Sequence, residues 1–80
     1  MMPLYGFLQG DTIGLLLLAE EENTMEEIGE KLKQAASVRV RPKPGGIIVF
    51  HGEELNSRLC LSETTIAALD RIDLVWEKHP

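Results

Sequence analysis

The sequence predicts an α+β domain with strand and helix segments in the order ββαββ. Three observations carry this prediction. Two apolar runs flank a turn-rich tetrapeptide near the N-terminus, a capping box opens a single striped helix, and two strand-like runs follow a proline-rich connection. With 80 residues, the chain has room for one domain, 1–80, and a domain of this size buries only about 60% of the surface that its unfolded chain exposes.

The N-terminal part predicts a β-hairpin. Apolar runs at residues 3–8 and 13–19 lie on either side of Gln9-Gly10-Asp11-Thr12, and Gly and Asp are typical turn residues.

The helix is predicted from residue 24 onward. Thr24 and Glu27 have the spacing of a capping box, and one apolar stripe extends over about twelve residues. Pro42 and Pro44, followed by two glycines, rule out a longer helix. The stripe consists of Met25, Ile28, Leu32 and Ala35.

The C-terminal half predicts short strands joined by turns and a loop. The run 47–50 is rich in β-branched and aromatic residues, His51-Gly52 predicts a tight turn, and Leu55 is expected to anchor a short return strand. Residues 72–76 predict the last strand. Four apolar residues in the intervening polar loop are expected to enter the core: Leu59, Leu61, Ile66 and Leu69.

Charge and cysteine content narrow the classes of function. A net charge of −5 argues against a nucleic-acid partner, because phosphate contacts require a surplus of Lys and Arg. The single cysteine, Cys60, has no intramolecular partner and favours the cytoplasm. The longest apolar run, 13–19, is shorter than the roughly 20 residues of a membrane span. We therefore expect a soluble, unprocessed cytoplasmic chain without a membrane segment.

No catalytic constellation is visible in the sequence. The two histidines, His51 and His79, lie at no ligand spacing from Cys60 or from an acidic cluster. Gly45-Gly46 follows prolines and precedes no helix, which is the wrong context for a phosphate loop. We expect no catalytic residue, no metal and no cofactor, and hence no enzyme activity of the chain by itself.

A protein partner is the function that the apolar pattern favours. Side chains alternate between the two faces of a strand. If Ile13, Leu15 and Leu17 face the helix, two neighbouring leucines face away from it. A contiguous apolar patch on a small domain typically marks an interface, and the same patch could form a homodimer in the isolated chain. By this parity the outer face carries Leu16, Leu18, Ile47, Val49 and Val75, and we expect Arg39 and Arg41 to add rim contacts.

Several motifs together resemble ubiquitin and its relatives, the β-grasp fold. They are Gly10-x-Thr12-Ile13-x-Leu15, the Thr24-capped helix, Ile48-x-Phe50-x-Gly52-x-x-Leu55, Leu61-Ser62 and Ile72-x-Leu74-Val75. The resemblance implies a helix across a mixed sheet, with the first and last strands parallel at its centre. It also implies an apolar patch at Leu8, Val49 and Val75. Because the sequence ends in residues 76–80 without Gly-Gly, we expect no conjugation chemistry.

A narrower set of residues resembles the small ubiquitin-like subunit of bacterial multicomponent aromatic monooxygenases, the toluene class of di-iron hydroxylases. The residues are Asn23-Thr24-Met25, Ile28-x-Glu30-Lys31, Arg39-Val40-x-Pro42-x-Pro44 and Leu69-Asp70-x-Ile72-Asp73-Leu74-Val75. The resemblance implies a non-catalytic subunit that docks on a larger hydroxylase-like subunit. The alternative is a free-standing ubiquitin-like adaptor without conjugation activity.

Overall fold

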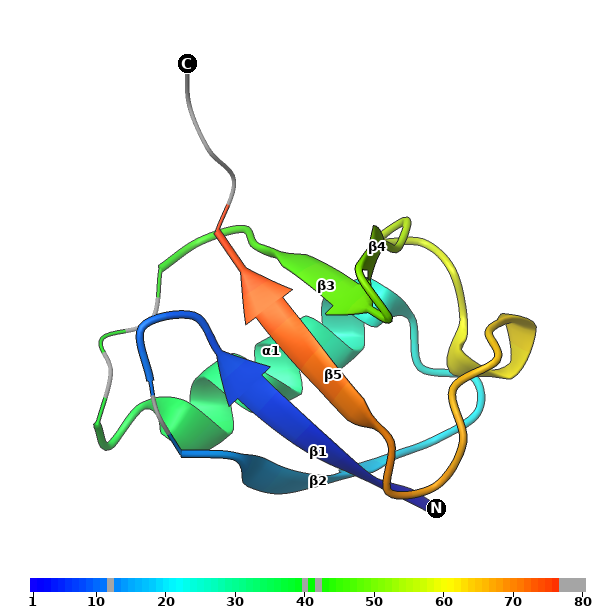
Figure 1. Cartoon of the computed structure of the whole chain (residues 1–80), viewed down its shortest axis with the longest axis horizontal. Helices are drawn as coiled ribbons and strands as arrows, with labels where there is room; N and C mark the ends of the chain where they lie inside the picture. Colours follow the sequence, from blue (N-terminus) through cyan, green and yellow to red (C-terminus); the bar gives the residue numbers. More distant parts are fainter. Residues whose placement is uncertain (12, 40, 42, 77–80) are drawn as a thin grey trace.

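The computed structural model describes residues 1–11, 13–39, 41 and 43–76. Figure 1 shows a five-stranded mixed sheet crossed by one helix, which confirms the predicted fold class. The predicted order ββαββ names four strands, and the short return strand predicted after the His51-Gly52 turn makes the total five. The elements are β1 (Met2–Leu8), β2 (Leu15–Ala19), α1 (Met25–Ala36), β3 (Ile47–Phe50), β4 (Glu53–Glu54), a short 3-10 helix (Leu61–Glu63) and β5 (Arg71–Val75).

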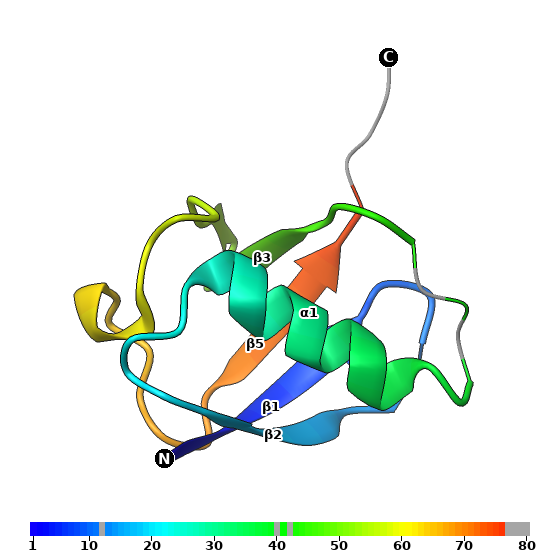
Figure 2. The same cartoon turned by 180° about the vertical axis from the view of Figure 1, so that it is seen from behind.

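The strand order is β2-β1-β5-β3-β4. The first and last strands are parallel neighbours, with Tyr5 opposite Arg71 and Leu8 opposite Leu74; the other pairs are antiparallel. Figure 1 looks onto the open face of the sheet, and Figure 2 onto the face that α1 covers. We call the open side the outer sheet face.

The core lies between α1 and the sheet. Strand alternation sends every second side chain of β1, β3 and β5 toward the helix, and the helix contributes its own apolar stripe. The largest fully buried side chains are Leu4, Leu8, Met25, Ile28, Leu32, Leu61, Ile72 and Leu74.

The capping box at the start of α1 is confirmed. The Glu27 N–H donates to Thr24 Oγ1 at 3.2 Å, and the Thr24 N–H donates to Glu27 Oε1 at 2.9 Å. The predicted stripe is wrong at its last position, because Ala36 is buried and Ala35 is exposed. At about 100° per residue, the eleventh step after Met25 returns nearer to the starting direction than the tenth.

Lys33, in the last turn of α1, holds the connection between α1 and β3 against the helix. Its buried Nζ lies 2.6 Å from Glu30 Oε2 and donates to the carbonyls of Lys43 and Gly45 at 3.1 and 2.9 Å. The ring of Trp76 lies 5.9 Å from the same nitrogen. Some predictions fall on residues outside the described ranges: Thr12 in the hairpin turn, Val40 and Pro42 after the helix, and the C-terminal residues 77–80.

The β3–β4 turn agrees with its prediction. His51 and Gly52 have φ values of 51° and 80°, as a two-residue hairpin turn of the primed type requires. Leu55 follows β4 and packs against the core. Its N–H donates to the Ile48 carbonyl at 2.9 Å.

The loop after β4 places three of its four predicted apolar residues on the core. Leu61 and Ile66 are buried, and Leu59 is partly buried. Leu69 is 56% exposed, so its predicted core position is wrong. Its φ of 67° belongs to a tight turn, and its N–H donates to the Pro3 carbonyl, an arrangement that turns the side chain outward.

Cys60 lies half-buried in the same loop as a free thiol. Partial burial raises the pKa of this thiol, and the neighbouring Glu63 carboxylate raises it further. No helix within the described ranges is long and apolar enough to cross a bilayer.

Candidate functional site

The outer sheet face has an apolar cluster on its β2 side. Leu16 is 59% and Leu18 52% exposed, whereas Leu17 between them is buried. Leu16 lies opposite Tyr5, and Leu18 lies opposite Pro3. Leu16 and Leu18 thus point away from α1, as strand parity predicts. Together with exposed Tyr5 they form what we call the β2 cluster.

A second apolar cluster lies on β3 and β5. Ile47 is opposite Val75, and Val49 lies on the same face of β3, two residues along the strand. All three are half-buried, while the alternate residues of β3, Ile48 and Phe50, are buried in the core. We call Ile47, Val49 and Val75 the β3 cluster.

An ion pair separates the two clusters, so the predicted patch is not contiguous. Arg71 Nη2 lies 3.0 Å from Asp73 Oδ1, and Asp73 is paired with Val49 in the sheet register. The Arg71 guanidinium also lies 4.0 Å from the centre of the Phe7 ring. On its other side Phe7 occupies space that Gly14 leaves open, because a Cβ at Gly14 would come within 2.5 Å of Phe7 Cζ.

Tyr5, Phe7 and Arg71 were not among the predicted site residues, although the sequence holds a signal for Arg71. Once Ile72 and Leu74 are assigned to the core, alternation places Arg71 and Asp73 on the outer sheet face. In β1 the same rule shows only that Tyr5 and Phe7 share a face, and the pairing with β5 in the structure makes this the outer sheet face.

Two assigned orientations are wrong. Leu8 was expected in the outer apolar patch, but it is only 2% exposed and lies in the core, because Leu4, Gly6 and Leu8 share the side of β1 that faces α1. Ile13 was expected to face the helix, but it lies before β2 begins and is exposed. The alternation rule does not extend past the end of the strand.

The predicted rim arginines lie in the segment between α1 and β3. Arg39 Nη2 is 2.7 Å from Asp11 Oδ2, so this guanidinium ties the end of the helix to the β1–β2 connection. Arg41 is exposed. The structure therefore gives Arg39 an internal partner.

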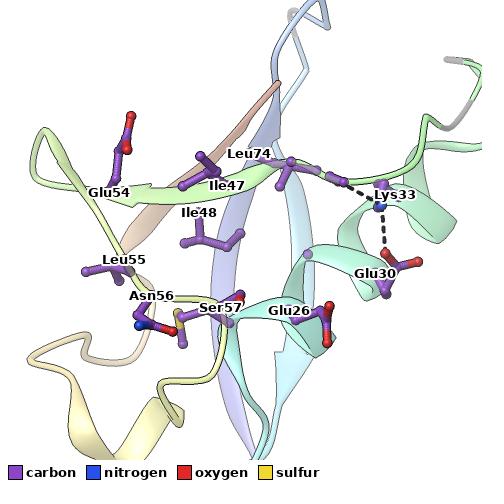
Figure 3. A pocket seen from close by; sticks show the side chains of 14 residues that line it. Glu26, Glu30, Lys33, Ile47, Ile48, Glu54, Leu55, Asn56, Ser57 and Leu74 are labelled. Carbon is purple, nitrogen blue, oxygen red and sulfur yellow. Dashed lines mark hydrogen bonds and ion pairs between the residues drawn. The ribbon is translucent and has the colours of Figure 1, made fainter. Parts of the chain in front are cut away.

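A groove of about 610 Å³ opens on the other side of the sheet, between α1 and the β3–β4 edge. Figure 3 shows Glu26, Glu30 and Lys33 along its helical wall and Glu54 to Ser57 on the facing wall. Ile48, Leu55 and Leu74 contribute apolar surface. Across the described ranges, no three His, Cys, Asp or Glu side chains gather closely enough to hold a metal ion.

Comparison with known proteins places the chain in a family. The family described as toluene-4-monooxygenase system protein B (TmoB) matches residues 1–76. The chain belongs to this family. Among curated proteins, none matches the sequence significantly.

Solved structures agree with the fold of this TmoB family member. A chain of "Toluene 4 monooxygenase HD Complex with Inhibitor 4-Bromobenzoate" is similar with a TM-score of 0.87 at 21% identity, covering 95% of this chain and 98% of that one. "Caldiarchaeum Subterraneum Ubiquitin" is similar with a TM-score of 0.73 at 15% identity, covering 98% and 95%. A chain of "Molecular Mimicry of SUMO promotes DNA repair" is similar with a TM-score of 0.73 at 16% identity, covering 94% of this chain and 90% of that one. At these identities, the likenesses establish the ubiquitin-like β-grasp fold.

Proposed function

We propose that this chain is a non-catalytic subunit of a bacterial multicomponent monooxygenase of the toluene class, docked on a larger hydroxylase subunit in the cytoplasm. The observation that carries the proposal is the family match over residues 1–76. The likeness to a chain of the toluene 4-monooxygenase complex supports it along nearly the full length of both chains. The role we assign is binding, with the chemistry performed by the larger subunit.

We assign the docking role to the outer sheet face. Exposed leucines and a tyrosine on β2 and β1 flank an arginine whose guanidinium is already held by Phe7 and Asp73. Tyr and Arg are enriched among residues that dominate binding energy, and a pre-ordered arginine loses less side-chain entropy on binding. A standard interface covers about 800 Å² on each partner, so the interface that we propose includes both clusters and the ion pair between them.

The test is co-purification from the cells that naturally produce the chain. A tagged full-length chain is expressed in these cells, and the eluate is examined for subunit stoichiometry and bound iron at high salt. We expect a stable complex with one large subunit per chain and iron in the large subunit. Recovery of the chain alone, as a monomer or a homodimer, would overturn the proposal and favour the free-standing adaptor.

A further inference from the structure

The guanidinium of Arg71, at the centre of the outer sheet face, is only partly satisfied by this chain. Its Nε and Nη2 both donate to Asp73 Oδ1, at 3.3 and 3.0 Å, and its Cζ lies 4.0 Å from the centre of the Phe7 ring. A guanidinium is planar and carries five N–H donors in fixed directions. Asp73 uses two of these donors, and among the described residues the others meet no acceptor.

The free donors point away from Asp73. Nε and Nη2 share the edge of the guanidinium that Asp73 occupies. The next edge, between Nη1 and Nη2, offers two parallel N–H bonds, and this spacing matches the two oxygens of a carboxylate. The side chain of Arg71 is 64% exposed, so a second protein can reach this edge.

The surroundings of this edge hold no other charge on the β2 side. Arg71 lies opposite Tyr5, and the outward side chains of β1 and β2 are all uncharged: Pro3, Tyr5, Phe7, Leu16 and Leu18. On the β3 side, Glu54 is opposite Val49, which is opposite Asp73. Two strand spacings place the Glu54 backbone about 10 Å from that of Asp73, beyond one screening length of about 8 Å at physiological salt.

Docking of the outer sheet face would take water away from the free edge. A partner that covers Tyr5 and the exposed leucines also covers the neighbouring guanidinium, and its free donors then lose their bonds to water. Charged donors that are buried without an acceptor are costly. Asp73 cannot fill the free edge, because it holds the guanidinium from the other edge. The acceptor must therefore come from the partner.

We propose that the larger subunit presents an aspartate or glutamate carboxylate to the free edge of Arg71. In the complex the guanidinium then bridges two carboxylates, that of Asp73 through Nε and Nη2 and that of the partner through Nη1 and Nη2. Apolar side chains of the partner pack beside this bridge on the β2 cluster and the β3 cluster. The inference rests on the proposed docking of the outer sheet face and adds the chemistry of the surface that covers it.

The test is a crosslink in the complex of the full-length chain with the large subunit that co-purifies with it. Arg71→Lys keeps the positive charge and introduces a primary amine, which a water-soluble carbodiimide joins to a carboxylate in contact with it as an amide. Peptide mass spectrometry should find an amide between position 71 and an Asp or Glu of the large subunit. The matched control is Arg58→Lys, which places an amine in the exposed loop after β4 and should give no such crosslink from position 58.

The outcomes separate this inference from the proposed function. A large subunit that co-purifies but forms no crosslink with position 71, or a crosslink from position 71 to Asp73 alone, would overturn the carboxylate and leave the docking in place. If no large subunit co-purifies, both the docking and the carboxylate are refuted.

Affinity for the same large subunit gives a second readout. Arg71→Gln should weaken binding about 10- to 150-fold, because it removes a charged donor from a dry interface. Arg58→Gln should change the Kd less than about twofold. Arg71→Lys should fall between the unchanged chain and Arg71→Gln, since an ammonium keeps the charge but lacks the parallel donors. Equal weakening by both Gln variants, or full affinity in Arg71→Lys, would refute recognition of a carboxylate through the free edge.

Discussion

Replacing the two exposed leucines of β2 by threonine tests the outer sheet face. Leu16 and Leu18 each keep roughly half of their surface exposed in the free chain. Full burial of a leucine side chain contributes about 1.5–3 kcal/mol, so the half left for a partner contributes about 0.8–1.5 kcal/mol each. Leu16→Thr with Leu18→Thr should therefore weaken binding by about 1.5–3 kcal/mol, which is roughly 10- to 150-fold in Kd.

The assay is titration of the chain into the purified large hydroxylase subunit, with thermal unfolding of the free chain measured in parallel. Threonine keeps the β-branched character that strands favour, so the free variant should fold. The lost burial on folding should lower its melting temperature by about 4–8 °C per kcal/mol. A lower affinity with a retained unfolding transition separates docking from folding.

The matched control is Ile13→Thr with Val38→Thr, which changes two exposed apolar residues outside the strands. Its affinity should stay within about threefold of that of the unchanged chain, because a scattered exposed apolar residue contributes little. Loss of affinity in the control to the same extent, or an unchanged Kd for the leucine variant, would refute the assignment of the outer sheet face.

Three further predictions concern individual residues. Burial and Glu63 raise the pKa of Cys60, so at pH 8 the folded chain holds less thiolate, and iodoacetamide should label Cys60 more slowly in the folded than in the unfolded chain. Glu63→Gln should lower the pKa of Cys60 and speed the labelling, and an unchanged labelling rate in this variant would contradict the effect of the carboxylate. Gly52→Ala should lower the free energy of unfolding, measured in urea, by about 1–2 kcal/mol because φ is 80° at this residue, although the space around it is open. An unchanged free energy of unfolding would contradict the turn geometry. Leu69→Asn should raise the free energy of unfolding by about 0.5–1 kcal/mol, since asparagine tolerates a φ of 67° better than leucine does. A lower free energy of unfolding would reveal a packing role for Leu69.

Features set by local chemistry could be predicted from the sequence. The reciprocal bonds of Thr24 and Glu27 depend only on residues three apart, and the His51-Gly52 turn depends on two adjacent residues. The outward direction of Leu16 and Leu18 followed from a run of four leucines, because any register leaves two of them outside.

Features set by register or by distant contacts could not be predicted in the same way. β1 carries apolar residues on both faces, so its sequence alone does not decide whether Leu8 or Phe7 faces α1. The ion pair that divides the outer sheet face becomes visible only once Arg71 and Asp73 are placed beside Phe7. The groove has no local motif, since its walls come from the helix, the start of β3 and the loop after β4.

The parallel pairing of β1 with β5 has a consequence for biosynthesis. Tyr5 pairs with Arg71, so the chain must have left the ribosome up to residue 71 before the two strands can meet. Contacts of such long range also slow folding, because the intervening loop must close first. Until then β1 lacks its central neighbour and β2 lacks a finished sheet behind it. The docking that we propose therefore follows the synthesis of β5, because the outer sheet face is incomplete before residues 71–75 have joined the sheet.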